Sequence, residues 1–277
     1  MARPPVEWPI PVYVTELRER VVMSFRVPAR FLAGRIPAPV LPELVRSQAV
    51  VSLCLGTGRC LKPAGAGPLL ASEFRVAELV TPVRWQAACR PALRGLFTLR
   101  LLTDSAGVAR LVQTALEFPA EVSRHRQGMD ATGYGCELSS SHPADSAQLS
   151  LPRPVAESEW PGKSLFTTPE EAEIALLHPE YVFVPERSGR AVRAVPVHHY
   201  ARSTTAVAPT AAVAPLVAWS LGAKPEEIEL DHVLYQKRCT HTWSFPPERI
   251  VTATSPVAGR LRRLPMRESA RPTLLAA

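Results

Sequence analysis

The chain has 277 residues, 46% hydrophobic and 21% charged, as in an ordinary globular protein that buries its core without disulfide staples. Its net charge is +7, but five arginines and one glutamate in residues 259–277 supply +4 and leave about +3 for the rest. Basic and aromatic side chains are not interleaved on any one element, so we do not expect a nucleic-acid partner.

The sequence predicts a cytoplasmic protein. Its five cysteines are an odd number and form no C-x-x-C pair, which is typical of reduced thiols. The first twenty residues lack the apolar region of a signal peptide. The most apolar stretch, residues 207–223, is interrupted by Pro209 and Pro215 and is too short to span a bilayer, so no membrane association is expected.

The 29 prolines predict many short elements, because proline is excluded from helix interiors and central strands. Pro28 favours a short helix start, which Gly34 and Pro37 would end. Three runs rich in Val, Leu and Phe then predict strands over residues 49–55, 72–85 and 93–104.

Apolar residues at helical spacing predict a helix over residues 105–118, closed by Pro119. Further strands are expected over 131–141 and 147–152. Thr168, Pro169 and Glu171 form the start of a second helix, with a capping-box pattern.

The last part of the chain reads as strands. Residues 181–200 predict a hairpin around Ser188 and Gly189, and residues 230–243 predict a long final strand. No repeat or internal linker is visible. We therefore expect one mainly β (α+β) domain over residues 1–258, followed by a basic, flexible tail over 259–277.

The common motifs for metals and phosphates are missing from the sequence. The G-T-G at 56–58 lacks the further glycines of a phosphate-binding loop, and no G-x-S-x-G or H-E-x-x-H occurs. His198 and His199 are adjacent, so in a strand they point to opposite faces and cannot share an ion. We expect no metal and no cofactor.

One of these two histidines must face the interior if residues 191–200 form a strand. His199 has the parity of Val195 and Val197, which places it inside and His198 outside. Pro196 works against this assignment, because a bulge there would shift the parity by one. An interior histidine either satisfies a hydrogen bond or serves as an acid or base near neutral pH.

Several short motifs, in this order, resemble the family called DUF2071, which is related to the bacterial YqjF proteins and belongs to the acetoacetate decarboxylase-like superfamily. They are VVMSFRVPARFLAGRIP, EFRVAELV, LRGLFTL, LEFPAEVSRHRQGMD, KSLFTTPEEAEIALL and VPVHHYARSTTAVA. The likeness covers roughly residues 10–245. It implies a closed, cone-like antiparallel β-barrel with a few flanking helices, which can enclose a small ligand.

The sequence departs from this superfamily where its reaction takes place. Acetoacetate decarboxylases carry a lysine after a Phe/Tyr-Pro pair, and that amine forms a Schiff base with the substrate. Here Phe118 and Pro119 are followed by Ala120 and Glu121. A carboxylate cannot form an imine, and none of the four lysines lies in this segment.

Two functions therefore stay open. The chain is either a barrel that binds a small apolar or acidic molecule without the Schiff-base lysine, or a lyase- or isomerase-type enzyme that uses acid/base chemistry on a small carbonyl or carboxylic compound. We assign Glu121 and His199 as the catalytic candidates. The candidates for ligand binding are Arg75, Arg126, His198 and Tyr200. Assembly into a homo-oligomer is left open.

Overall fold

A computed structural model describes residues 12–63, 73–86, 91–129, 133–140, 145–152, 157–244 and 248–252. The expected tail over 259–277 lies outside these residues, as does the end of the expected domain at 258. No helix among the described residues has the length and apolar character needed to cross a membrane.

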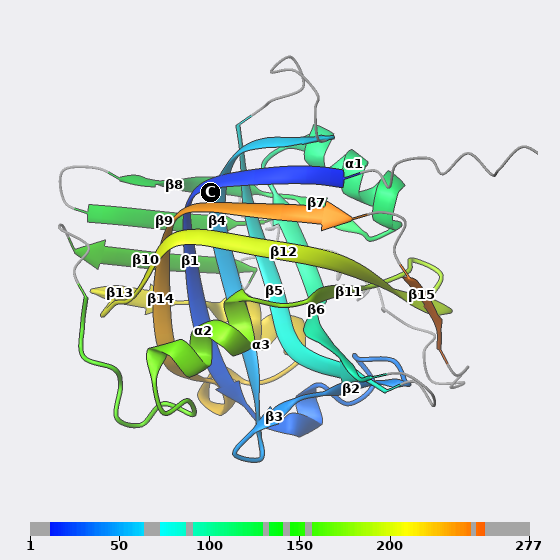
Figure 1. The fold of residues 1–277 in the computed structure, drawn as a ribbon. Helices are drawn as coiled ribbons and strands as arrows, with labels where there is room; N and C mark the ends of the chain where they lie inside the picture. The colour runs from blue at the N-terminus through cyan, green and yellow to red at the C-terminus, as the bar shows by residue number, and fades with distance from the viewer. Residues whose placement is uncertain are drawn as a thin grey trace, which may run out of the picture.

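Seven strands form a closed barrel, so the predicted fold class is confirmed (Figure 1). The ring runs β5–β4–β1–β14–β12–β11–β6, and pairing of β6 with β5 closes it. The bounds of these strands are β1 Val12–Val27, β4 Gln48–Pro63, β5 Phe74–Trp85, β6 Leu93–Thr103, β11 Tyr181–Pro185, β12 Ala191–Ala206 and β14 Glu229–Ser244.

Six of the seven pairings are antiparallel, as expected, and the seventh, β11 with β6, is parallel. Parallel neighbours need a long crossover connection, and about eighty residues separate these two strands. That crossover carries most of a second, four-stranded sheet, whose fourth strand, β13, comes later in the chain: β8 Arg124–Met129, β9 Gly133–Ser139, β10 Ser146–Pro152 and β13 Ala211–Val213.

Short elements cover the edges and ends of the barrel. The strands are β2 Val40–Pro42, β3 Leu44–Val45, β7 Ala120–Val122 and β15 Glu248–Val251; the helices are α1 Ala106–Leu116, α2 Pro169–Leu177 and α3 Pro215–Leu221, with 3-10 turns Ala29–Phe31 and Pro225–Glu227. The predicted helices over 105–118 and from Pro169 are confirmed, and the one expected after Pro28 is a single 3-10 turn. Helix α3 was not predicted.

The capping chemistry of α2 follows the sequence with one change. The Thr168 hydroxyl accepts from the Glu171 backbone amide, as expected of a cap. The Glu171 carboxylate instead reaches the backbone amide of Thr167, at 2.6 Å. The helix therefore starts at Pro169 with Thr168 as its cap, as predicted, and only the bond to the Glu171 carboxylate lies one residue earlier than the capping-box pattern places it.

Successive side chains of a barrel strand point alternately to the outer wall and to the interior, and so they belong to two different hydrophobic regions. On β1, Val21, Met23 and Phe25 join the large core that also contains Tyr134 and Leu149 of the second sheet. The edge-to-face contact of Tyr134 with Tyr235, with ring centroids 6.0 Å apart, spans the two layers. The largest core thus lies on the outer wall of the barrel, and the barrel interior is left for other side chains.

A break in this alternation lies halfway along β1, β14 and β12. Arg18, Arg238 and Arg202 occupy the same level on the three adjacent strands and are each skipped by the pairing ladder. Arg238 has φ of 50°, in the left-handed region that distorts a strand. As a result Leu17 and Arg20, three residues apart, both face the interior.

Residues 160–177, which we call the plug, fill one end of the barrel. Leu165, Phe166 and Leu176 of the plug pack against the inward-facing Val22 and Leu234. Side chains of the plug and of the strands form one buried apolar cluster there, separate from the outer core. The plug closes this end of the barrel to water.

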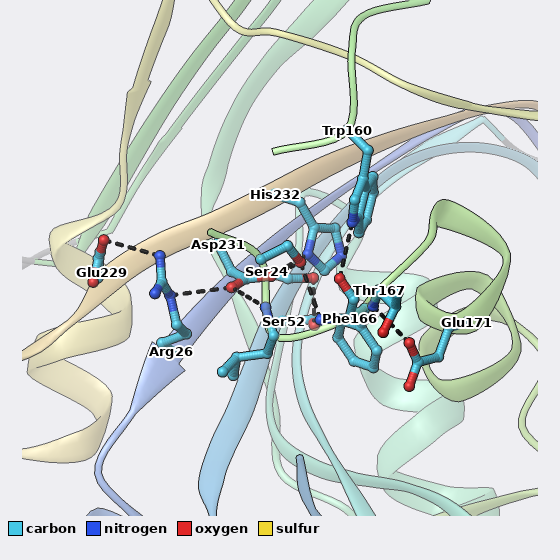
Figure 2. A network of polar contacts seen from close by, with 12 residues as sticks. Ser24, Arg26, Ser52, Trp160, Phe166, Thr167, Glu171, Glu229, Asp231 and His232 are labelled. Atoms are coloured by element: carbon cyan, nitrogen blue, oxygen red, sulfur yellow. Dashed lines mark hydrogen bonds and ion pairs between the residues drawn. The ribbon is translucent and has the colours of Figure 1, made fainter. Parts of the chain in front are cut away.

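Asp231 fixes the plug to β14 (Figure 2). Its carboxylate accepts hydrogen bonds from the Ser164 hydroxyl at 2.6 Å and the Leu165 amide at 2.9 Å, and it lies 2.7 Å from His232 Nδ1. Arg26 Nε lies 3.1 Å from the same carboxylate. Burial favours the neutral form of Asp231, but the hydrogen bonds from His232 and Ser164 outweigh it and lower the pKa.

The His232 ring also anchors the plug. It packs against Trp160, with centroids 4.8 Å apart, and edge-on against Phe166, at 5.5 Å, while the Trp160 indole donates to the Phe166 carbonyl. These contacts come from both ends of a seven-residue stretch of the plug. The plug is therefore held by polar and aromatic contacts together.

We predict that Asp231→Asn lowers the melting temperature by about 10 °C, because removing one partner of a buried ion pair costs roughly 3–5 kcal/mol in a domain of this size. Thermal denaturation followed by circular dichroism measures it. Glu229→Gln is the matched control: Glu229 contacts the same Arg26, but its side chain is 66% exposed, so its loss changes little. Equal losses from both variants would contradict the anchoring role of Asp231.

Candidate functional site

Two adjoining cavities lie inside the barrel, between the plug and α1. Their walls come from all seven barrel strands, and they share Arg20, Glu78, Val182, His241 and Trp243. The shared residues stand where one cavity meets the other. This junction is the polar centre of an otherwise apolar interior.

The larger cavity, of about 140 Å³, extends from the junction toward α1. Most of its wall is apolar, including Phe74, Val108, Leu111, Val112, Phe118 and Trp243. The amphipathic spacing of α1 places its apolar face here, and Phe118 follows from the same segment. A cavity of this kind favours an apolar group over water.

The smaller cavity, of about 20 Å³, lies on the side of the plug, where Leu177 and Pro179 form part of its wall. Arg20, Glu78, His199 and His241 bring polar groups to it. Nδ1 of His199 and Nε2 of His241 are buried and have no hydrogen-bond partner among the described residues. The volume and the polar wall suit one water molecule.

Arg20 is 5% exposed and carries a charge that burial does not remove, because a guanidinium stays protonated in proteins. Its contacts are weak: Nη1 lies 3.5 Å from Gln236 Oε1, and Nη2 lies 3.4 Å from Cys54 Sγ. Within the described residues, no carboxylate lies within 4.0 Å of its nitrogens. The guanidinium is therefore a buried cation without a close counter-ion.

The groups around Arg20 do not supply that counter-charge at neutral pH. Burial raises the pKa of the Cys54 thiol, so the thiol stays neutral. Burial, together with Arg20, lowers the pKa of His199 to about 3 and that of His241 well below its usual value. Both imidazoles are neutral, and Arg20 is the permanent charge of the centre.

Glu78 is the carboxyl group of the centre. It accepts a hydrogen bond from the Thr98 hydroxyl at 2.8 Å. Burial raises its pKa from the ordinary value, although Thr98 and Arg20 act in the opposite direction. A buried carboxyl group whose pKa is shifted in this direction is a candidate general acid or base.

Gln236, which is fully buried, connects the parts of the centre. Its oxygen faces Arg20 and the Cys239 thiol, and its amide nitrogen lies 3.0 Å from the Thr204 hydroxyl and 3.3 Å from His199 Nε2. Because the amide nitrogen can only donate, His199 accepts at Nε2 and carries its proton on Nδ1. That proton points to no partner among the described residues.

His199 faces the interior and lines the smaller cavity, while His198 is exposed, which is the arrangement that the alternation predicts. Tyr200, proposed as a ligand contact, is 68% exposed on the outer face. The strand reaches His199 without a parity shift, since Val197 also lines the smaller cavity. Neither His198 nor Tyr200 lines a cavity.

The structure does not bring the other predicted site residues to the cavities. Glu121 is bound on the outer side of β6 by Arg100, with bonds of 2.8 and 2.6 Å, because β7 pairs beside β6 and lies outside the ring. Arg126 is exposed on β8. Arg75 points away from the interior and pairs with Asp104 at 3.0 Å.

Sequence reasoning missed Arg20 and Glu78. The inward position of Glu78 could have been predicted, because it is two and four residues from Val76 and Phe74 in a strand that was predicted. The inward position of Arg20 could not, since alternation from Leu17 places Glu19 inside and Arg20 outside. The break at Arg18 reverses that assignment.

Metal binding finds no support in the described residues, where no group of three or more His, Cys, Asp or Glu side chains is placed to hold an ion. The described cysteines, Cys54, Cys136 and Cys239, are buried free thiols. The described lysines, Lys163, Lys224 and Lys237, are exposed, apart from Lys62, whose side chain is not described.

Solved structures match the chain over most of its length. Acetoacetate decarboxylase from Legionella pneumophila is 14% identical, with a TM-score of 0.59 over 91% of this chain and 92% of that one. The chain has the acetoacetate decarboxylase fold. The enduracididine biosynthesis enzyme MppR, with HEPES bound, is 11% identical, with a TM-score of 0.56 over 88% and 89%.

A third similar structure is an acetoacetate decarboxylase-like enzyme from Sphingomonas wittichii, 12% identical, with a TM-score of 0.53 over 87% of this chain and 94% of that one. No family model and no curated protein sequence matches the chain. Identities this low establish the fold and leave the reaction to be argued from the site.

We predict that Glu78→Gln becomes more stabilising, relative to the natural chain, as the pH rises. The folded state favours protonated Glu78, so its contribution to stability is complete below the unfolded pKa of about 4.3 and is lost as the pH rises through the raised folded pKa. Glutamine resembles the protonated form at every pH.

Melting temperatures measured from about pH 4 to about pH 8 test this prediction, with the exposed Glu137→Gln as the control. The difference between the Glu78 variant and the natural chain should grow from the unfolded pKa up to the raised folded pKa and then level off, while the control difference stays flat. A constant difference for Glu78→Gln would show that this carboxyl group ionises as freely as a surface one.

Proposed function

We propose that this protein binds a small carboxylic acid inside its barrel, with the carboxylate at Arg20, and that it does so without a Schiff base. The observation that carries the proposal is the buried Arg20 guanidinium, which faces a cavity and has no close counter-ion among the described residues. A buried charge without a partner is costly, and an anionic ligand relieves that cost. Arginine also presents paired donors that match a carboxylate.

The charge count favours a single negative charge. Arg20 is the one cation among the residues that line the two cavities. A monocarboxylate matches it, whereas a phosphate dianion would leave one charge uncompensated in an apolar wall. The raised pKa of Glu78 favours its protonated form, which carries no charge to oppose such a ligand.

No lysine among the described residues that line the cavities could form an imine with a ligand. The cavity walls contain no lysine among the described residues, and the segment Phe118–Glu121 places Ala120 and Glu121 where acetoacetate decarboxylases carry the Schiff-base lysine. Ala120 is buried beside Phe118, which does line the cavity. By that resemblance, the chain offers no amine at the position of the Schiff-base lysine.

We predict that Arg20→Met binds monocarboxylic acids about tenfold or more weakly than the natural chain, because a hydrogen bond to a charged group contributes roughly 1.5–3 kcal/mol. Titration calorimetry with a panel of such acids measures it. The exposed Arg202→Met on β12 is the matched control and should bind as the natural chain does.

Arg20→Met should also melt at the same temperature as the natural chain or higher, since an apolar residue replaces a buried charge. Retained folding with lost binding supports the proposal. Equal affinity of both variants for every acid would contradict it.

A second candidate is a lyase that adds water to an unsaturated carboxylic acid or removes it. The smaller cavity favours this candidate, because it has room for one water beside Glu78 and the two histidines. Glu78 in its ionised form would take a proton from that water as the oxygen attacks one alkene carbon. The same proton would then pass to the other carbon, so that atoms and charge balance.

Incubation of the protein with 2-alkenoic acids in water enriched in heavy oxygen tests this candidate by mass spectrometry. The lyase reading predicts a hydroxy acid that carries the heavy oxygen, and no product from Glu78→Gln even though the acid still binds. Binding without turnover in the natural chain would leave the protein a carrier or sensor of acids.

We also propose a cytoplasmic setting, a small-molecule partner instead of nucleic acid or membrane, and kinship with the DUF2071 family. The free, buried thiols of Cys54, Cys136 and Cys239 support a reducing compartment. The order of short motifs supports the family. A homo-oligomer stays open and is decided by light scattering.

A further inference from the structure

The proposed function specifies only the carboxylate of the ligand. The size and lining of the larger cavity indicate what the rest of the ligand is. We propose that the acid bound at Arg20 is an arylalkanoic or medium-chain fatty acid, with an apolar group about the size of a benzene ring. Contact with α1 limits the length of this group. This inference rests on the proposed function, since it places the carboxylate at Arg20.

The volume of the cavity sets the size of that group. About 140 Å³ is available. An engineered apolar cavity of roughly 150 Å³ in another protein stays free of water and binds benzene. A two- or three-carbon acid would leave most of this space empty, and an empty apolar cavity loses dispersion contacts along its whole wall.

The wall determines the polarity of the group. Beyond the junction at Arg20 and Glu78, the lining side chains are mainly aliphatic and aromatic. Phe74 and Phe118 bring two rings to this space, and Trp243 adds a third at the junction. A hydroxyl or amide in this part of the ligand would lose its hydrogen bonds to water and gain few in return. An alkyl or aryl group loses nothing and gains buried area.

The direction of the group follows from the two ends of the barrel. The plug fills one end with Leu176, Leu177 and Phe166, so the ligand cannot extend past the smaller cavity. From Arg20, the free space leads toward Val108, Leu111 and Val112 of α1. The α1 face is therefore the far wall, where chain length is limited.

Substitutions that change the side-chain volume at position 112 test whether α1 limits the length of the ligand. Val112→Phe shortens the cavity, and Val112→Ala lengthens it. Thr114→Phe adds the same ring to the same helix at an exposed position and serves as the matched control. Melting temperatures establish that each variant folds.

The measurement is the Kd, by calorimetry, for straight-chain acids from acetate to decanoate, 3-phenylpropanoate and the neutral 3-phenylpropanamide. For the natural chain, each added methylene should tighten binding about fourfold, equivalent to about 0.8 kcal/mol, until the cavity is full and the gain stops. The optimum should move to shorter acids in Val112→Phe, to longer acids in Val112→Ala, and stay in place in Thr114→Phe.

Three results overturn the inference in different ways. Acids that bind with no dependence on length would refute the apolar group and leave carboxylate binding at Arg20 intact. An optimum that ignores both Val112 variants would remove α1 as the far wall. Failure of every acid to bind, or equal binding of the amide, would refute the proposed function itself.

Discussion

A guanidinium held inside a barrel without a close counter-ion is the constraint on which the rest of this structure depends. Taking a charge out of water costs several kcal/mol unless partners replace the solvent. In the part of the chain that the structure describes, the polar contacts of Arg20 are a thiol at 3.4 Å and an amide oxygen at 3.5 Å. The remainder of the chain must supply the stability that this centre lacks, and the arrangement of the cores shows how it does so.

The packing that stabilises the fold lies away from the polar centre around Arg20. The main core lies on the outer wall of the barrel, where Val21, Met23 and Tyr134 pack between two sheets, and the plug forms a second core at one end. The carboxylate of Asp231 satisfies donors from the plug and from two strands. The interior between the plug and α1 is thereby free to hold polar groups and empty space, which a functional site needs and a core excludes.

The departures from the sequence predictions have identifiable physical causes. Long apolar runs and proline boundaries were enough for six of the seven barrel strands and for α1 and α2, because burial on one face leaves a periodic pattern. The seventh strand, β1, was not predicted. Alternation was also enough for His199. It failed for Arg20 because the break at Arg18, Arg238 and Arg202 reverses the faces of β1 and β14, and a left-handed arginine has no mark in the sequence.

Glu121 shows a different limit. The resemblance to acetoacetate decarboxylases suggested a site residue after Phe118 and Pro119, but the Glu121 side chain is bound on the outer face by Arg100, about twenty residues earlier in the chain. Long-range ion pairs of this kind decide which face of a short edge strand points to the ligand. The local sequence pattern does not encode them. Of the polar residues that line the cavities, the sequence therefore named His199 and missed Arg20 and Glu78.

The most direct test of the central claim is a crystal structure of the protein with 3-phenylpropanoate bound. The account predicts that the carboxylate lies within hydrogen-bond distance of both terminal nitrogens of Arg20, with the ring between Phe118 and Val112 and with Glu78 still bonded to Thr98. A ligand bound elsewhere, or an Arg20 side chain that pairs with Glu78 and leaves the cavity to solvent, would contradict it.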